Sequence, residues 1–229
     1  ALGVGPGDEV IIPTFCWRTA FTAPAMLGAL PVFAEIDRSL NMDCDDFARK
    51  ITPRTKAVIV VHFQGASYQI ERIVEIAHSR GVKVVEDCAQ SFGASVRGRK
   101  LGTLGDVGCF SLQQNKIVTT GDGGLLITND AAIFERAARF HDLGGLRPAI
   151  EKQLENGPQE EPFVSCQFRM NEFSGAVALA QLRKLDSRIL GPTRRYHRML
   201  RERTAKTCPG LRLRPVDDVD GDAGIAFYM

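Results

Sequence analysis

The sequence has 229 residues, of which 44% are hydrophobic and 24% are charged. This composition excludes a disordered chain, a collagen-like repeat and a small disulfide scaffold, and the length is sufficient to bury a substantial core. The 29 basic and 27 acidic residues leave a formal charge of +2 and are scattered along the chain, so charge gives no support for binding to nucleic acid or to an anionic membrane surface.

The six cysteines are far apart, with no Cys-x-x-Cys pair and no histidine at zinc-ligand spacing. This pattern argues against a structural metal site and is typical of free thiols in a reducing compartment. No apolar run reaches the roughly 18 residues of a membrane helix, and the first residues lack the pattern of a signal peptide. We therefore expect a cytoplasmic protein that has no membrane partner.

Short apolar runs alternate with helical patterns from the beginning of the chain. Residues 8–13 (DEVIIP) and 30–37 (LPVFAEID) have the composition of strands, and a helix over residues 17–27, closed by Gly28, separates them. A strand, a helix and a second strand in this order form a βαβ unit, in which the two strands lie parallel.

The clearest βαβ unit covers residues 56–87. Residues 56–63 (KAVIVVHF) are apolar at consecutive positions, which favours a strand covered on both faces. Residues 69–81 carry one apolar stripe at helical spacing and end at a glycine, and residues 82–87 (VKVVED) predict the next strand. The stripe consists of Ile70, Ile73, Val74 and Ala77.

Two further strands are expected at residues 106–112 and 124–130, around a Gly-rich turn. A helix over residues 131–142 follows, with Asn129 or Asp130 as its N-cap. The whole alternation predicts an α/β fold with a mostly parallel sheet and helices on both faces. Ligands of such folds bind outside the carboxyl ends of the strands.

The last third of the chain has a different pattern. Residues 147–162 have no apolar period and end in an acidic, Pro-containing cluster, so we expect a mobile surface loop. Residues 171–189 and 193–206 predict two helices. The first of these is apolar around much of its circumference, so we expect it to pack against more than one neighbour.

Two strand ends carry residues that are suited to chemistry. Asp87 ends an otherwise apolar strand, where a carboxylate needs a cation or a hydrogen-bond donor, although a helix cap or a surface carboxylate is an equally good interpretation. Lys116 lies between the next strand and a turn containing Gly121, Gly123 and Gly124. A lysine shielded from water can form a Schiff base, whereas the alternative is a solvated loop lysine. A carboxylate for a pyridinium nitrogen and a lysine for an aldehyde, in this order, are what pyridoxal phosphate requires.

Together with their neighbours, these residues match a known family. The sequence resembles the fold-type-I pyridoxal-phosphate aminotransferases of the DegT/StrS type, which aminate keto sugars and cyclitols. The similarity covers nearly the whole chain, through the segments GVGPGDEVIIPTF, ITPRTKAVIVVHFQG, VVEDCAQSFGA, LGTLGDVGCFSLQQNK, TTGDGGLLITND and FRMNEFSGAVALAQL. It implies an aspartate-aminotransferase-like large domain (PLP fold type I) and pyridoxal 5'-phosphate (PLP) as the cofactor.

The resemblance assigns roles to five positions. It implies that Lys116 forms the Schiff base and moves a proton, and that Asp87 pairs with the pyridine nitrogen. Gln90 matches the residue that contacts the cofactor's 3-oxygen, and Ser111 matches a phosphate ligand. Trp17 matches an aromatic residue that stacks on the pyridine ring, with a core tryptophan as the alternative.

Three other positions differ from the family pattern or allow a second interpretation. Gln167 stands where the family has an asparagine that reaches the phosphate of the neighbouring subunit's cofactor, and Asp122 stands where glutamate is commoner. His62 is at a histidine position of the family, but a hydrogen-bonded structural histidine is at least as good an interpretation, and we leave it out of the site.

The resemblance also implies a function and a domain organisation. We expect transfer of an amino group from glutamate or glutamine to a keto sugar or an inosose-like cyclitol, by a ping-pong Schiff-base mechanism in a homodimer. Residues 1–190 match the PLP-binding large domain without its N-terminal phosphate-binding turn. Residues 191–229 match a helix that leads into a truncated small domain. The alternative is a catalytically inactive truncated fragment or a regulatory or interaction member of the same family.

Two other chemistries are disfavoured. Sugar dehydration on the same fold replaces the lysine with histidine, and Lys116 is retained here. Nucleotide binding on a Rossmann-like sheet requires a Gly-x-Gly-x-x-Gly turn between a strand and a helix, whereas the glycines of GVGPG precede a strand.

Overall fold

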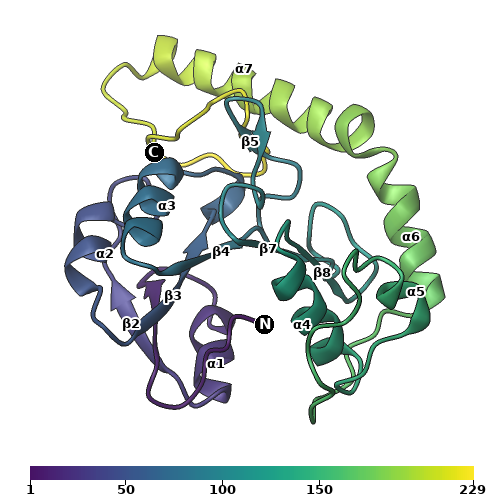
Figure 1. Ribbon diagram of the computed structural model, residues 1–229. Coiled ribbons are helices and arrows are strands. Elements are labelled where there is room, and N and C mark those ends of the chain that lie inside the picture. The colour runs from purple at the N-terminus through teal and green to yellow at the C-terminus, as the bar shows by residue number, and fades with distance from the viewer.

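The computed structural model describes residues 1–229, and its centre is one six-stranded sheet in the order β2-β1-β3-β4-β7-β8 (Figure 1). All neighbouring strands are parallel except β8, which is antiparallel to β7. The strands are β1 (Glu9–Pro13), β2 (Leu30–Ala34), β3 (Thr55–Val61), β4 (Lys83–Asp87), β7 (Val107–Ser111) and β8 (Gly124–Ile127). The short strands β5 (Ser95–Val96) and β6 (Arg99–Lys100) form a separate hairpin.

Helices connect and surround the sheet (Figure 1). The helices are α1 (Thr19–Met26), α2 (Cys44–Lys50), α3 (Ile70–Ser79), α4 (Ala131–His141), α5 (Pro148–Glu151), α6 (Glu172–Leu182) and α7 (Gly191–Thr207). A 3-10 turn, η1 (Phe63–Gly65), follows β3, and a π-helical segment, η2 (Leu185–Leu190), precedes α7. No helix has the length and apolar composition that crossing a bilayer requires.

Side chains from both faces of the sheet are buried. Ile11 and Val58 belong to the large core cluster, which also contains residues of α2 and α3. Their strand neighbours Val10 and Ala57 belong to a smaller cluster, which Ala29, after α1, joins. Successive residues of a strand point to opposite faces, so the two clusters lie on opposite sides. This confirms the predicted mostly parallel sheet with helices on both faces, and it explains the apolar runs without alternation.

The parallel order places several strand ends at one edge of the sheet. Val61 of β3 is in register with Asp87 of β4, and Asp87 is in register with Cys109 of β7. The chain passes from β1 to β2 on one side and then returns to β3 on the other side of β1. The direction of winding therefore changes between β1 and β3, and this is where such sheets leave a crevice for ligands.

The predicted helix over residues 171–189 is wrong in its second half. Helix α6 ends at Leu182, and the chain continues as the π-helical segment and then α7, which begins at Gly191. Leu185 and Leu190 are five residues apart, the spacing that a π-helix brings to one face, and both are buried. Gly93 has φ +80°, and a Cβ there would lie 2.6 Å from Leu190 and 3.0 Å from Leu185, so a larger residue would be strained and would displace the two leucines.

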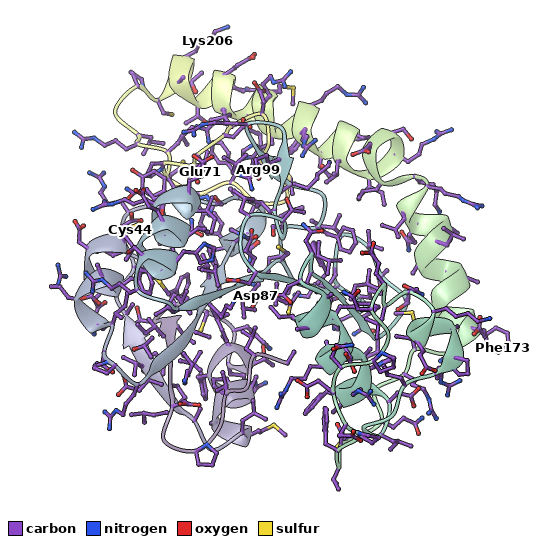
Figure 2. All side chains as sticks on the ribbon, viewed as in Figure 1. Cys44, Glu71, Asp87, Arg99, Phe173 and Lys206 are labelled. Atoms are coloured by element: carbon purple, nitrogen blue, oxygen red, sulfur yellow. The ribbon has the colours of Figure 1, made fainter.

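Helix α6 is also more exposed than its apolar sequence predicts. Ala178 is its only buried residue, whereas Phe173 is 87% exposed and points outward at the edge of the molecule in Figure 2. Val177 and Leu179 are half exposed. Within one chain several apolar side chains of this helix are therefore largely exposed.

The segment 147–162 contains the short helix α5 and is anchored to α4. The backbone amides of Gln159 and Glu160 donate to the Glu135 carboxylate over 2.8 and 3.0 Å, and Arg139 donates to it as well. Burial opposes ionisation of Glu135, but these hydrogen bonds outweigh it and lower the pKa of the carboxyl group. The predicted surface loop is thus fixed at one point by a buried carboxylate.

Candidate active site

A cavity of about 420 Å³ lies beyond the carboxyl ends of the central strands. Its walls come from the segments that follow β3, β4 and β7, from the junction of η2 and α7, and from the C-terminal segment. Gln90 and Lys116, both predicted as site residues, line it together. The other lining residues are Gln64, Ala89, Asn115, Ile117, Ile189, Leu190, Thr193 and Ile225.

Asp87 is the last residue of β4 and lies near the centre of the molecule (Figure 2). One carboxylate oxygen accepts a hydrogen bond from the amide of Ala89 over 3.0 Å, and no Lys or Arg forms an ion pair with it. Burial raises the pKa of the Asp87 carboxyl group, against the opposing effects of the Ala89 amide, of His62 and of Lys116. No full cationic partner faces Asp87 within the chain, and its side chain is half-buried rather than exposed.

Lys116 lies in the turn between β7 and β8. Leu112, which is fully buried, anchors this turn: its amide donates to Gly123 over 2.9 Å, and its carbonyl accepts from the amide of Thr120 over 2.9 Å. Ser111 ends β7, and its hydroxyl accepts the Gln113 amide over 3.3 Å, which leaves the hydroxyl proton available to a ligand. The half-buried lysine therefore sits on a turn that is fixed at both ends.

Trp17 lies on the loop between β1 and α1 and is 62% exposed. The Arg18 guanidinium lies 5.3 Å from the centroid of its ring. Its neighbour Cys16 is close enough to Asp87 for that carboxylate to contribute to a raised pKa of the thiol, after burial as the larger cause. The alternative of a core tryptophan is therefore wrong, and the loop that carries Trp17 passes near Asp87.

Gln167 is not brought to this cavity. It is exposed and forms an isolated antiparallel bridge with Asp142, beyond the end of α4. Asp142 accepts hydrogen bonds from Arg169 and from Arg147, and these arginines lower the pKa of its carboxyl group. The bridge holds the strand that carries Gln167 against α4. Asp122 is exposed in the turn before β8, where its carboxylate accepts the Gly123 amide.

His62 belongs to a buried network rather than to the cavity wall. Its Nε2 lies 2.8 Å from Glu86 Oε2, and both side chains are inaccessible to solvent. The amides of Gly102, Leu104 and Gly105 also donate to Glu86, over 2.7 to 2.8 Å. Burial opposes ionisation of Glu86, but these donors outweigh it and lower the pKa of its carboxyl group. A hydrogen-bonded structural histidine is what the structure contains.

This network predicts a large effect on stability. We expect Glu86→Gln to lower the free energy of unfolding at neutral pH by about 3 kcal/mol, because an amide NH2 group replaces one acceptor oxygen and leaves buried N–H donors without a partner. The folded-state pKa is lowered, so the stabilisation is complete above the unfolded pKa of about 4.3 and is lost as the pH falls through the folded pKa. Urea unfolding from neutral to acidic pH measures both effects.

The matched control for this experiment is Glu75→Gln on α3, which removes an exposed carboxylate. We expect it to change the unfolding free energy by less than about 0.5 kcal/mol. Equal stability of the two variants, or a Glu86→Gln deficit that does not shrink in acid, would contradict the role assigned to Glu86.

The sequence prediction missed several residues of the cavity. Gln64 and Asn115 line it, as do Thr193 and Ile225 from the last part of the chain. Gln64 had a usable signal, since it follows a strand end in a parallel sheet. Thr193 and Ile225 had none, because only the folding of the C-terminal segment over the strand ends brings them there.

A larger hollow of about 570 Å³ lies between the N-terminus of α4 and residues 153–159. It contains none of the predicted site residues, and its buried carboxylate, Glu135, is already satisfied by three donors. The smaller cavity is therefore the better candidate. It contains the amine of Lys116 and the amide of Gln90, and the nearby carboxylate of Asp87 has no full cationic partner.

Comparisons with known proteins identify relatives of this chain. GDP-perosamine synthase of Escherichia coli O157:H7 is 38% identical over 187 residues, 81% of this chain and 49% of the relative. L-glutamine:2-deoxy-scyllo-inosose aminotransferase of Streptomyces kanamyceticus is 39% identical over 191 residues, 81% of this chain and 44% of the relative. This chain thus spans about half the length of these relatives.

The structural comparison extends over nearly all of the chain. The crystal structure of the aminotransferase TlmJ from Streptoalloteichus hindustanus superposes with a TM-score of 0.81 and 36% sequence identity, over 99% of this chain and 60% of that one. The fold of the PLP-dependent aminotransferases is thereby confirmed. The DegT/DnrJ/EryC1/StrS aminotransferase family matches residues 1–217, nearly the whole sequence. The chain belongs to this family.

Proposed function

We propose that this protein is the cofactor-binding part of a PLP-dependent aminotransferase, which moves an amino group from glutamate or glutamine to a keto sugar or an inosose-like cyclitol. The observation that carries the proposal is the position of Lys116. Its amine is the only one on the wall of the cavity, where it lies with Gln90 close to the half-buried Asp87. Membership of the family and the names of the two relatives support the reaction and the substrate class.

The residues of the site fit PLP chemically. Asp87 is a half-buried carboxylate that lacks a full cationic partner, and a protonated pyridine nitrogen is a cation with one N–H donor. Gln90 accepts the backbone amide of Gln64 through Oε1, so its Nε2 remains a donor for an oxygen such as that of the cofactor ring. Ser111 offers a hydroxyl for the phosphate, and exposed Trp17 offers a ring face for stacking.

The mechanism assigns two tasks to Lys116. Its amine would hold the cofactor through the aldehyde carbon, and once free it would act as the base and acid that moves a proton between the substrate carbon bearing the amino group and that aldehyde carbon. Bound PLP supplies an electron sink for the negative charge that develops at the substrate carbon. Asp87 would hold the ring nitrogen in its protonated form, because a carboxylate and an adjacent positive charge stabilise each other.

We also propose that the protein works as a homodimer, with residues 1–190 as the large domain and residues 191–229 leading towards a second domain. The exposed apolar face of α6 supports an interface between two copies, with Gln167 directed to the neighbouring site. Light scattering after size exclusion measures this. The six free cysteines support a reducing, cytoplasmic environment.

Cofactor titration and an amino-transfer assay test the function. We expect the purified protein to become coloured when PLP is added, and to transfer nitrogen from glutamine or glutamate to 2-deoxy-scyllo-inosose or to a nucleotide-linked keto sugar. Mass spectrometry with nitrogen-labelled donors identifies the product. A protein that stays colourless contradicts the cofactor assignment. A coloured protein that aminates neither acceptor contradicts the substrate class.

A further inference from the structure

The turn that follows β3 carries backbone strain next to the cavity. Gln64 has φ 49° and ψ 47°, the left-handed region that non-glycine residues rarely adopt. Such a conformation persists only where the surroundings impose it. The adjoining Gly65 has φ +94°, and a Cβ there would meet Asp222, Ala223 and Ile225 at 3.0 to 3.2 Å. The turn thus packs closely against the C-terminal segment, which lies beside α3 in Figure 1.

Arg214 holds this turn from the C-terminal side. Its Nη1 donates to the carbonyl of Phe63 over 2.8 Å and its Nη2 to the carbonyl of Gln64 over 3.1 Å. The guanidinium is buried, lies 4.0 Å from the Asp222 carboxylate and 5.3 Å from the ring centroid of Tyr228. Two donors on one planar group therefore fix two successive carbonyls of the strained turn.

The other side of the turn contacts the candidate site. The amide of Gln64 donates to Gln90 Oε1 over 2.8 Å. Because a backbone N–H requires an acceptor, this bond decides the orientation of the Gln90 side-chain amide and leaves its Nε2 as a donor. Without the bond, the amide group could turn over and present its oxygen instead, which would repel an anionic oxygen of a ligand.

We propose that Arg214 is a positioning residue for Gln90, which acts through the strained turn at Phe63 and Gln64. By holding the two carbonyls, it keeps the Gln64 amide directed at Gln90 Oε1, and the Gln90 Nε2 donor thus stays available in the cavity. The proposal rests on the proposed function, since it takes the oxygen that Gln90 meets to be that of the PLP ring.

Arg194 provides a matched control. It also donates to backbone carbonyls of the C-terminal segment, those of Asp222 over 2.8 Å and Gly221 over 3.1 Å. It makes no hydrogen bond to the turn at residues 62–66. Arg194→Gln therefore weakens the attachment of the same segment but removes none of the hydrogen bonds that join Arg214, the turn and Gln90.

A double-mutant cycle on the dissociation constant of PLP tests the proposal. We expect Arg214→Gln to weaken PLP binding about ten-fold, and less than about two-fold when Gln90 is already replaced by alanine, because the coupled pair shares one hydrogen-bond path. We expect Arg194→Gln to lower the melting temperature but to change PLP binding by less than about two-fold. An Arg214→Gln effect of equal size with and without Gln90 overturns the proposal.

Amide hydrogen exchange in the cofactor-free protein is a second readout. We expect Arg214→Gln to accelerate exchange of the Gln64 amide at least about ten-fold, and Arg194→Gln to leave it unchanged. Unchanged exchange in Arg214→Gln overturns the proposal. If the wild-type protein binds no PLP, the proposed function fails, and exchange alone decides the role of Arg214. Should Arg214→Gln not fold, because Asp222 is left without its cation, Arg214→Lys keeps the charge with a single nitrogen, and the same pattern is expected.

Discussion

Replacement of Lys116 by alanine is expected to abolish both amino transfer and the visible colour of bound PLP. The rate should fall about 10⁴-fold or more, because the same amine attaches the cofactor and moves the proton, and no other lysine lines the cavity. The side chain is half-buried on a turn anchored by Leu112, so we expect the fold to remain intact. Absorption spectroscopy, the transfer assay and a melting curve measure the three effects.

A matched control and a chemical test accompany this prediction. Lys56→Ala removes an exposed lysine of β3 at the end of the sheet opposite the cavity, and it should leave rate and colour unchanged. Borohydride reduction of the wild-type protein with PLP should leave the cofactor on the peptide that contains Lys116. If Lys116→Ala retains the colour, or if the label is found on another lysine, the assignment of the nucleophile is wrong.

Replacement of Asp87 by asparagine is expected to change stability and function in opposite directions. Burial raises the pKa of the Asp87 carboxyl group, so its ionised form at neutral pH costs the folded state stability above the unfolded pKa. Asparagine has no charge to bury and can still accept the Ala89 amide, so the melting temperature of the cofactor-free protein should stay equal or rise. Amino transfer should fall by about 10²–10³-fold, because the charge that keeps the pyridine nitrogen protonated is lost.

The control for this variant is Asp106→Asn. Asp106 is also a carboxylate next to a sheet strand, but it accepts from Lys83 over 2.8 Å and from the Val84 amide over 2.8 Å, at the opposite end of β4. The pKa of Asp106 is lowered, since these donors outweigh burial, so its loss should reduce stability and leave PLP binding unchanged. A drop in melting temperature for Asp87→Asn without loss of PLP binding would mean that Asp87 is a structural carboxylate.

The candidate site shows why some of its residues could be predicted and others could not. Asp87, Ser111 and Lys116 follow strands whose apolar runs are visible in the sequence, and parallel strands bring their carboxyl ends to one edge. Local sequence patterns are therefore enough to predict that these three residues lie close together. The resemblance assigned Gln167 to the neighbouring subunit's cofactor, and within one chain the structure places it at a bridge with Asp142, outside the cavity.

The prediction of one continuous helix over residues 171–189 was wrong for a different reason. The apolar periodicity of residues 171–189 fits one α-helix, and nothing local indicates a change to a π-helical segment. Leu185 and Leu190 turn to one face because Gly93, almost a hundred positions earlier, leaves space for both side chains. A contact between distant segments therefore overrides the local pattern.

The sequence alone determined the parallel sheet with two covered faces, the resemblance to the aminotransferase family, and the lysine and carboxylate at neighbouring strand ends. Periodicity and residue type carry this information, because they reflect which faces are buried. Only the tertiary structure decided how the amide of Gln90 is oriented. This orientation depends on a left-handed turn at Gln64 and on Arg214, which bonds to Phe63 from 151 positions away. Such contacts leave no periodic trace, since they join single residues of irregular segments that come together only when the chain is folded.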